Sequence, residues 1–284
     1  MPENQKNLKY HKYKDQQNFI AEYSPRESKH HYGPNFHLLA NPYLRSLLAR
    51  FSTPQIGQPL LNTYLEILYT HLLGEALGTL APQIGVHWET RMKESHPDEG
   101  IFQGSVVREN LAVICVAMAR AGTWPSHICF HQLHHYFYPP YLRQDHIYLG
   151  RKADDAGQVV GVDLFGSKIG GGQEGAVVLV PDPMGATGRS ITEVLDHYKK
   201  NVPGKALKYV AMNLIVTSEY IQYLNQHHPD VQIFAYRVDR GLSSEKVLQS
   251  ELGLYLKEEK GLNSKQYIVP GAGGVGEILN NSFV

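Results

Sequence analysis

The stretch VVLVPDPMGATGRSITEVLDHY, residues 177–198, places one carboxylate between two prolines, after an apolar run and before a helical pattern. Residues 177–180 favour a central strand, and Pro181 and Pro183, which lack a backbone N–H, are expected to end its pairing. The small residues that follow leave amide N–H groups unpaired at a helix start, where the helix dipole favours an anion. A carboxylate, Asp182, beside such an anion cradle predicts a site that holds a phosphorylated sugar by its hydroxyls and its phosphate.

Three side chains of the loop strengthen this interpretation. The hydroxyls of Thr187 and Ser190 can donate hydrogen bonds to phosphate oxygens, and Arg189 adds a positive charge. The spacing fits neither a Walker loop, which needs Gly-Lys-Ser/Thr, nor a G-x-G-x-x-G dinucleotide turn. An ordinary strand–turn–helix connection is the alternative interpretation of the same residues.

The rest of the chain predicts the sheet that would position this loop. Apolar runs alternate with segments whose apolar residues recur at helical spacing, which is typical of parallel strands joined by crossover helices. We therefore expect an α/β fold with a central, mostly parallel sheet flanked by helices. In such sheets ligands bind at the carboxyl ends of the strands, which is where Asp182 lies. The expected strands are 111–119, 146–150, 177–180, 209–217 and 231–238; the expected helices are 41–50, 60–80, 124–135, one that begins near 190, and 219–227; residues 97–104 are expected to be a loop.

Composition argues against several classes of function. The 284 residues include 27 Lys and Arg against 27 Asp and Glu, so nothing favours non-specific binding to nucleic acid or to a membrane surface. No apolar run approaches the roughly 18 residues of a membrane span, and the polar start does not resemble a secretory signal. Cys115 and Cys129 both lie among apolar residues and predict buried thiols in a cytoplasmic protein. Residues 1–36 are polar and aperiodic, so we expect an N-terminal arm and one domain over residues 37–284.

Three stretches, in order, resemble one family. LVPDPMGATGRS, residues 179–190, resembles the phosphoribosyl-pyrophosphate (PRPP) motif of type I phosphoribosyltransferases, and most of all the Asp-Pro-Met-x-Ala-Thr-Gly-Gly-Ser of the uracil phosphoribosyltransferases. GLNSKQYIVPGAGGVGEIL, residues 261–279, is similar to that family's C-terminal signature, and ARAG, residues 119–122, matches the Arg-Ala-Gly that ends an earlier strand. The resemblance implies the type I phosphoribosyltransferase fold, with a flap hairpin at residues 151–168 and a C-terminal hood that binds the base.

The resemblance also implies an activity and a site. The activity is the transfer of ribose 5-phosphate from PRPP to N1 of uracil, which gives UMP and pyrophosphate in pyrimidine salvage, with Mg²⁺ accompanying PRPP. A homodimer or higher homo-oligomer is implied as well. Asp182 would hold the ribose hydroxyls, and Arg120 and Arg151 would bind the pyrophosphate through their planar guanidinium groups. The residues implied for PRPP are Arg120, Arg151, Asp182, Pro183, Met184, Gly185, Ala186, Thr187, Gly188, Arg189 and Ser190, of which Asp182, Arg120 and Arg151 are implied for catalysis; those implied for the base are Tyr267, Ile268, Gly273, Gly274 and Val275, largely through backbone groups.

Three positions depart from the family pattern. Gly274 stands where the family has an Asp that contacts PRPP, and the last acid of the signature is Glu277 rather than Asp. Arg189 stands where the family has Gly, and a positive φ there would strain any residue with a Cβ. Two alternatives therefore stay open: a homologue that binds PRPP or nucleotides without catalysis, and an enzyme that uses another nucleobase.

A histidine-rich helix end is a weaker candidate site. His131, His134 and His135 have the spacing at which two histidines on one helix face could bind zinc. A further ligand with matching spacing is missing from the sequence, so a polar helix end beside an aromatic turn is the favoured interpretation.

Overall fold

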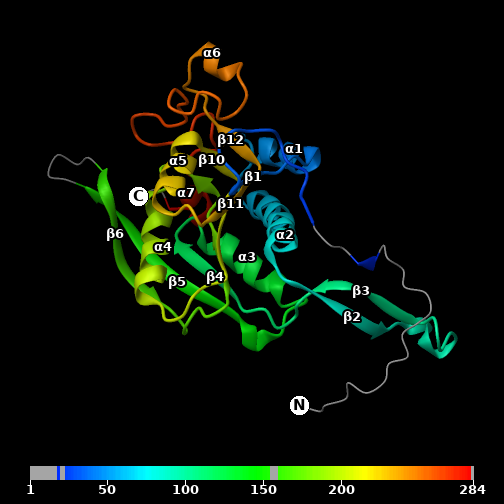
Figure 1. Cartoon of the computed structure of the whole chain (residues 1–284). Helices are drawn as coiled ribbons and strands as arrows, with labels where there is room; N and C mark the ends of the chain where they lie inside the picture. Colours follow the sequence, from blue (N-terminus) through cyan, green and yellow to red (C-terminus); the bar gives the residue numbers. More distant parts are fainter. Residues whose placement is uncertain (1–17, 20–22, 154–158, 283–284) are drawn as a thin grey trace.

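The structure, a computed structural model, describes residues 18–19, 23–153 and 159–282, without the side chains of residues 151–153 and 159–160. Within these residues, seven strands form a central sheet in the order β1-β11-β9-β7-β4-β5-β6 (Figure 1). Neighbouring strands run parallel except β5 and β6. The central strands β4 and β7 are buried on both faces, as their continuous apolar runs predict. The strands are β1 (Phe36–Leu38), β4 (Val113–Ala119), β5 (Leu142–Ala153), β6 (Val159–Lys168), β7 (Val177–Pro181), β9 (Lys208–Met212) and β11 (Gln232–Ala235).

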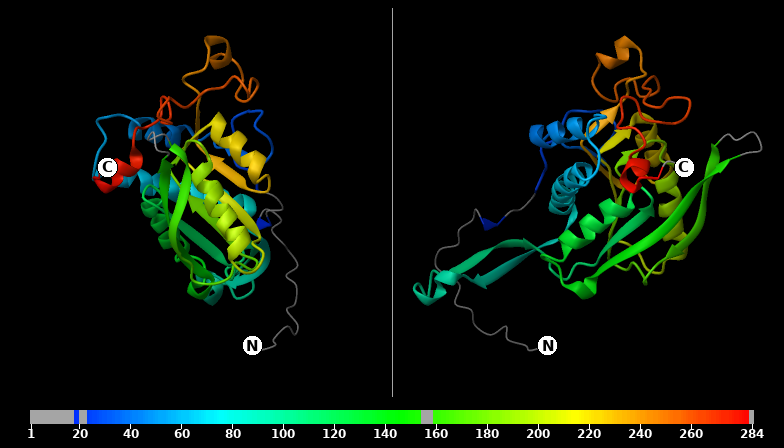
Figure 2. Two further views of the ribbon diagram at one scale, coloured as in Figure 1. Left: turned by 90° about the vertical axis from the view of Figure 1, so that its left-hand side faces the viewer. Right: turned by 180° about the vertical axis from the view of Figure 1, so that it is seen from behind.

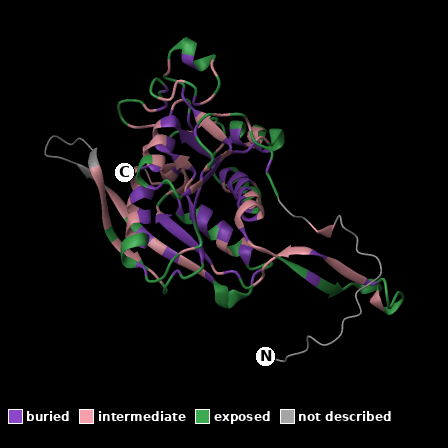
Figure 3. Ribbon diagram, in the orientation of Figure 1, coloured by how far each residue is buried: buried purple, intermediate pink, exposed green. Residues whose placement is uncertain are grey.

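Helices cover both faces of this sheet, which confirms the predicted α/β class (Figure 2). Successive residues of a strand face opposite sides. Along β4, Val113 and Cys115 therefore pack into the core that includes α1, α2 and α3, while Ile114 and Val116 pack into the core that includes α4 and α5. The buried residues accordingly gather in the middle of the molecule (Figure 3). The predicted helices are confirmed within two residues at each compared end: α1 (Pro42–Phe51), α2 (Leu60–Leu80), α3 (Thr123–Leu133), α4 (Arg189–Asn201) and α5 (Ser218–His227).

Three chain segments continue from the central sheet into a second, smaller parallel sheet of order β12-β10-β8. The prediction of single strands over 209–217 and 231–238 is therefore wrong, because each run breaks and enters the second sheet. Asn213, fully buried at the break, donates from Nδ2 to the carbonyl of Asp182 at 2.7 Å and accepts the Tyr220 hydroxyl at 2.9 Å. Such side-chain bonds satisfy backbone groups that a break in the ladder would leave unpaired. The strands are β8 (Met184–Gly185), β10 (Ile215–Thr217) and β12 (Arg237–Asp239).

The pairing of β7 with β9 continues through Pro181. The prediction that Pro181 and Pro183 end strand pairing is therefore wrong. The Asp182 N–H donates to the carbonyl of Met212 at 3.0 Å, and β8 begins directly after Pro183. Proline is tolerated because alternate residues of a parallel strand donate to opposite neighbours, and the pairing of β7 with β4 ends at Leu179. The missing N–H of Pro181 therefore falls where β7 has no partner strand.

Two antiparallel hairpins extend from the body (Figures 1 and 2). β5 and β6 form the predicted flap hairpin, whose pairing begins at His146 and Lys168 and whose tip, residues 154–158, lies outside the described residues. A second hairpin joins β2 (Gln83–Glu89) to β3 (Ile101–Val107) through the 3-10 helix η2 (Arg91–Glu94). The prediction of a loop over 97–104 is thus wrong for residues 101–104. These residues pair with a strand 18 or fewer positions earlier, which their own short pattern does not reveal.

Part of the predicted N-terminal arm packs on the body. Tyr32 and Phe36 are 4% and 1% exposed and belong to the core that includes α4 and α5. Residues 1–17 and 20–22 lie outside the described residues. The division of the chain at residue 36 stays a prediction.

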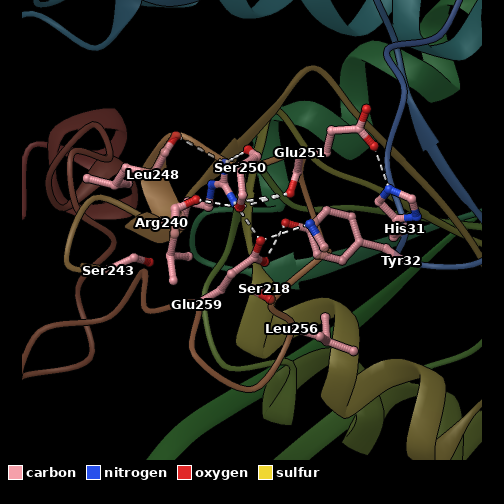
Figure 4. Close-up of polar contacts among 12 residues, drawn as sticks. His31, Tyr32, Ser218, Arg240, Ser243, Leu248, Ser250, Glu251, Leu256 and Glu259 are labelled. Atoms are coloured by element: carbon pink, nitrogen blue, oxygen red, sulfur yellow. Dashed lines mark hydrogen bonds and ion pairs between the residues drawn. The ribbon is translucent and has the colours of Figure 1, made fainter. Parts of the chain in front are cut away.

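A buried ion pair fixes the long segment after β12 (Figure 4). Arg240 Nη1 lies 2.7 Å from Glu259 Oε1, and the two side chains are 8% and 0% exposed. The Tyr32 hydroxyl donates to Glu259 Oε2 at 2.7 Å, and the Gly253 N–H donates to Oε1 at 2.8 Å. Burial acts to raise the pKa of Glu259, but hydrogen bonds from Tyr32, Ser218 and Gly253 and the Arg240 contact together hold this pKa below its usual value. The pair thus ties the segment that carries α6 (Glu245–Leu248) to residues near the start of the fold.

The remaining elements are the 3-10 helix η3 (Pro139–Tyr141) and α7 (Val275–Asn280). Cys115 and Cys129 are free and fully buried, as predicted, and burial raises the pKa of both thiols. Among the helices of the described residues, none combines the length and apolar character that crossing a membrane requires.

Candidate functional site

A groove lies beside the carboxyl ends of β4 and β7, and Asp182 stands where its three hollows meet. The first hollow is lined by the loop after β7 and by Gly161 and Val162 of the flap hairpin. The second lies around Arg120 at the end of β4, and the third is enclosed by residues from Gln266 to Glu277. One extended ligand could therefore contact all three while its middle rests on Asp182.

The Asp182 carboxyl lies on the floor of this groove, in partly buried surroundings. Loss of solvent raises its pKa from 3.8 to about 6, and the N–H of Met184, 3.4 Å from Oδ1, partly offsets this rise. The backbone on either side is fixed, because the Asp182 N–H donates to Met212 and its carbonyl accepts from Asn213. The structure thus holds a poorly solvated carboxylate in place, ready to accept hydrogen bonds from ligand hydroxyl groups.

The loop that follows has the form of the predicted anion cradle. The first intrahelical bond of α4 runs from the Thr192 N–H to the Gly188 carbonyl, at 3.1 Å. The amides before Thr192 therefore have no intrahelical partner, although the Arg189 N–H donates weakly to Thr187 Oγ1 at 3.4 Å, and they lie at the positive end of the helix dipole. The Thr217 hydroxyl supports the loop by donating to the Ala186 carbonyl at 2.6 Å. The loop presents its amides, together with Ser190 and Thr187, to the first hollow.

The residue with positive φ in this loop is Gly188, at 79°, and Arg189 is the first residue of α4. A Cβ at Gly188 would lie 3.1 Å from Tyr223 Cδ1, so both the backbone and the neighbouring ring favour glycine. The possible strain at Arg189 does not arise, because the turn into the helix is completed one residue earlier. Arg189 lines the first hollow.

Two arginines are expected to bind pyrophosphate, and the structure places one of them. Arg120 follows β4 after a cis peptide bond with Ala119, is exposed, and lines the second and third hollows. Its Nη1 donates to the carbonyl oxygen and Oγ of Ser282. Arg151 lies in β5, where its backbone pairs with Val162, but its side chain is outside the described part of the structure.

The backbone around the third hollow is held by a partly buried ion pair. Arg237 Nε lies 2.7 Å from Asp239 Oδ1, and the Asp239 side chain is 3% exposed. The Gly271 N–H donates to Asp239 Oδ2 at 2.8 Å, while its carbonyl accepts from Arg237 Nη2 at 3.0 Å. The end of β12 thus fixes the Pro-Gly turn that leads to Gly273, Gly274 and Val275.

A carboxylate occupies the space beside Gly274. A Cβ built on Gly274 would lie only 2.2 Å from Glu277 Oε2. Glu277 Oε1 accepts the Tyr267 hydroxyl at 3.3 Å, and Glu277 lines the third hollow. The acid that position 274 lacks is therefore replaced in space by an acid three residues further on, and Gly274 is the residue that leaves room for it.

The predicted site residues lie close together, with three exceptions. Pro183 and Gly185 are buried beneath the loop rather than in its hollows, where Pro183 accepts backbone hydrogen bonds and a Cβ at Gly185 would meet Val216 at 2.8 Å. The side chain of Arg151 is not described. The residues that line the groove as predicted are Arg120, Asp182, Met184, Ala186, Thr187, Gly188, Arg189, Ser190, Tyr267, Ile268, Gly273, Gly274 and Val275.

Sequence reasoning missed Gln266, which lines both the first and the third hollow. Its φ is 62°, an unusual value for a residue with a Cβ, and such backbone is concentrated at functional sites. The available signal was its position directly before Tyr267. The histidine-rich helix end contributes nothing to the groove: His131 and His135 touch edge to face, and no group of three or more metal-binding side chains occurs in the described part of the chain.

Comparison with known proteins decides the family. The family model described as uracil phosphoribosyltransferase matches residues 38–255, which is most of the chain. The chain belongs to the uracil phosphoribosyltransferase family. The fold that this family implied is confirmed, with its mostly parallel sheet, flanking helices and flap hairpin.

Individual relatives match over shorter spans. A uracil phosphoribosyltransferase of Thermococcus kodakarensis is 33% identical over 100 residues, which cover 35% of this chain and 34% of that protein. A uracil phosphoribosyltransferase of Pyrobaculum islandicum is 28% identical over 130 residues, which cover 45% of this chain and 51% of that protein. The chain thus spans about a third to a half of the length of these curated relatives. The solved AQ2163 protein of Aquifex aeolicus superposes with a TM-score of 0.64 at 20% identity, covering 86% of this chain and 97% of that one, which shows a shared fold.

Proposed function

We propose that this protein is a uracil phosphoribosyltransferase, which converts uracil and PRPP to UMP and pyrophosphate. The observation that carries the proposal is the groove in which an anion cradle, Asp182, Arg120 and a glycine-rich backbone pocket adjoin one another. This arrangement has a place for each part of PRPP and for a flat base beside it. Family membership supports the same reading.

The groove suggests a division of roles along PRPP. Amides from Ala186 to Ser190, with the Thr187 and Ser190 hydroxyls, would hold the 5-phosphate. Asp182 would accept hydrogen bonds from the ribose hydroxyls, and Arg120 and Arg151 would hold the pyrophosphate.

The reaction then needs little covalent chemistry from side chains. The bond from ribose C1 to the pyrophosphate oxygen breaks, the bond from C1 to uracil N1 forms, and the N1 proton is lost. The transition state has positive charge at C1, so catalysis rests on alignment and on stabilising the departing pyrophosphate. Arg120 would stabilise the negative charge that builds up on the departing pyrophosphate. The flap hairpin, two of whose residues line the first hollow, would exclude water that competes with the base.

Magnesium is expected to arrive with PRPP. Mg²⁺ is usually held by one or two carboxylates together with substrate phosphates and waters. The groove offers Asp182 and Glu277, and no cluster of three ligating side chains was found in the described residues, so the donors present fit a metal shared with substrate. Bound there, the ion would supply charge neutralisation for the diphosphate.

Base recognition would use the third hollow. Backbone groups of Tyr267 and Ile268, with Gly273, Gly274 and Val275 around them, would bind the edge of uracil. Gly274 motivates one alternative, a PRPP-binding homologue without turnover, and the departures from the family pattern together motivate the other, an enzyme for another base. The Glu277 carboxylate, the counterpart of the signature's last acid, lies beside Gly274 and keeps one acid in that part of the groove, which supports turnover.

One assay tests the proposal. Purified protein with uracil, PRPP and Mg²⁺ should form UMP and pyrophosphate, and chelation of Mg²⁺ should abolish this. Competition with cytosine, adenine and guanine identifies the preferred base. Folded protein that binds PRPP by calorimetry but forms no product with any base would support the non-catalytic alternative.

We further propose a homodimer or higher homo-oligomer. The β2–β3 hairpin carries Ile84 and Trp88, which are 43% and 42% exposed, on the same face. A second copy of this chain would cover that face; light scattering of the wild type and of Trp88→Lys tests this. A cytoplasmic location stays a prediction.

A further inference from the structure

Arg120 is held by a part of the chain that has no assigned role in the proposed reaction. Its Nη1 donates to the Ser282 carbonyl oxygen at 3.2 Å and to Ser282 Oγ at 2.8 Å. Arg120 is exposed and still lines the second and third hollows. A free arginine loses side-chain entropy when it binds a ligand, so a contact that fixes the guanidinium beforehand favours binding.

The contact leaves one edge of the guanidinium available. Nη1 is the nitrogen that Ser282 engages, whereas Nε and Nη2 make no hydrogen bond to other described residues. Nε and Nη2 form a parallel donor pair that matches two oxygens of one phosphate group. Arg120 is thus restrained through one nitrogen and keeps a bidentate edge for an anion.

Ser282 is itself fixed by the end of α7. Asn281 has a φ of 45° and caps the helix, and the Ser282 N–H donates to the Glu277 carbonyl at 3.0 Å. The Gln58 side chain donates to the Leu279 carbonyl at 3.2 Å, which ties α7 to a residue two positions before the start of α2. Ser282 therefore occupies a defined position relative to the groove.

We propose that Ser282 is a positioning residue for Arg120: it orients the guanidinium so that Nε and Nη2 receive a phosphate group of the diphosphate. The inference rests on the proposed function, because it concerns how the site holds PRPP and pyrophosphate. The Glu277 side chain lines the third hollow, and the Glu277 carbonyl accepts the hydrogen bond from the Ser282 N–H. The same short helix thus serves both the base end and the diphosphate end of the groove.

Three variants of the full chain test the role of the hydroxyl. Ser282→Ala removes the Oγ that accepts from Arg120, and Ser282→Thr retains a hydroxyl. Ser46→Ala is the control, because it removes an exposed serine hydroxyl that makes one hydrogen bond, to the Pro42 carbonyl at 2.8 Å, on α1. The measurement is calorimetric titration with magnesium pyrophosphate. Loss of one hydrogen bond predicts that Ser282→Ala weakens binding about two- to tenfold. Ser282→Thr and Ser46→Ala should bind as the wild type does.

Kinetics separate a positioning role from a general structural one. Ser282→Ala should raise KM for PRPP and lower kcat, because Arg120 both binds the diphosphate and stabilises its departure, while KM for uracil and the melting temperature stay close to wild type. In an Arg120→Lys background, Ser282→Ala should have no further effect on pyrophosphate affinity, because lysine has no guanidinium fork to orient.

Two results would overturn the proposal. One is wild-type pyrophosphate affinity in Ser282→Ala; the other is an equal loss of affinity in the Arg120 and Arg120→Lys backgrounds. Failure of the proposed function looks different, because the wild type itself would then bind neither PRPP nor pyrophosphate with Mg²⁺, and this inference would fail with it.

Discussion

Replacing Asp182 with Asn should stabilise the free protein while it weakens PRPP binding. The pKa of Asp182 is raised from 3.8 to about 6, because the folded state leaves its carboxylate poorly solvated. Folding therefore favours the protonated form, and the wild type loses stability as pH rises from about 4 through about 6. Asn is close to Asp in shape and stays neutral, and its Oδ1 can still accept from Met184, so the variant should show no such loss.

The magnitude follows from the size of the pKa shift. About two pKa units at 1.36 kcal/mol each give a free-energy difference of about 3 kcal/mol above pH 7, which is an upper value because the side chain is partly accessible through the groove. For a chain of this length, about 2 °C per kcal/mol corresponds to a rise in melting temperature of about 3–6 °C. The difference between variant and wild type should be near zero at pH 4 and largest at pH 8.

Thermal melts without ligand between pH 4 and pH 8 measure this difference. Asp98→Asn, which removes an exposed carboxylate of the β2–β3 hairpin, is the control and should change stability by less than about 0.5 kcal/mol at every pH. Calorimetry should show PRPP binding by the wild type that strengthens as pH rises through about 6, and much weaker binding by Asp182→Asn. The reasoning would be refuted if Asp182→Asn and the wild type had the same melting temperature at pH 8, or if the variant were stabilised equally at every pH.

Three further changes test other contacts. Glu259→Gln leaves Arg240 buried without its charge partner and should lower the free energy of unfolding by about 3–5 kcal/mol, measured by urea titration. The pKa of Glu259 is held below its usual value, so the stability that the pair contributes in the wild type should be present at neutral pH and lost as pH falls through that pKa. Gly274→Asp displaces the Glu277 carboxylate, the far end of a flexible side chain, and places a second negative charge beside it, so it should cost less than about 1 kcal/mol in thermal melts. Adding Glu277→Ala should remove that cost, and a loss of several kcal/mol in the single variant would contradict this reasoning. Gly188→Ala forces a residue with a Cβ into a left-handed backbone conformation beside Tyr223, so it should cost about 1–2 kcal/mol of stability in thermal melts and weaken PRPP binding. The control, Gly57→Ala, adds a Cβ that would meet nothing within 4 Å, so its stability and PRPP binding should match the wild type.

Local patterns predicted the parts of this protein whose determinants lie close together in the chain. The anion cradle was predictable because strand, acid, small-residue turn and helix occupy residues 177–198 without interruption. Helical spacing predicted α2 to the residue, because its buried leucines recur along one continuous segment. The third hollow was expected from the family resemblance, whose C-terminal signature covers the glycine-rich backbone between Tyr267 and Val275.

Other features depend on residues far apart. At the break after β9, the Asn213 side chain bonds to Asp182 and Tyr220, which come from other parts of the chain. The β3 strand exists because β2 lies beside it, and each half alone is too short to show a convincing period. Gln266 adopts its positive φ in a turn whose neighbours in the first hollow come from the loop after β7 and from α4.

The amino-acid sequence by itself determined the order of the main helices and central strands, and a carboxylate followed by a small-residue turn into a helix, since these follow from spacing and from backbone chemistry within a few residues. Only the tertiary structure decided that the Glu277 carboxylate fills the space beside Gly274, that Ser282 restrains Arg120 across 162 positions, and that desolvation perturbs the pKa of Asp182. The physical reason is that hydrogen bonding and desolvation act over a few ångströms in space. Which groups come within that range is settled by how the layers pack.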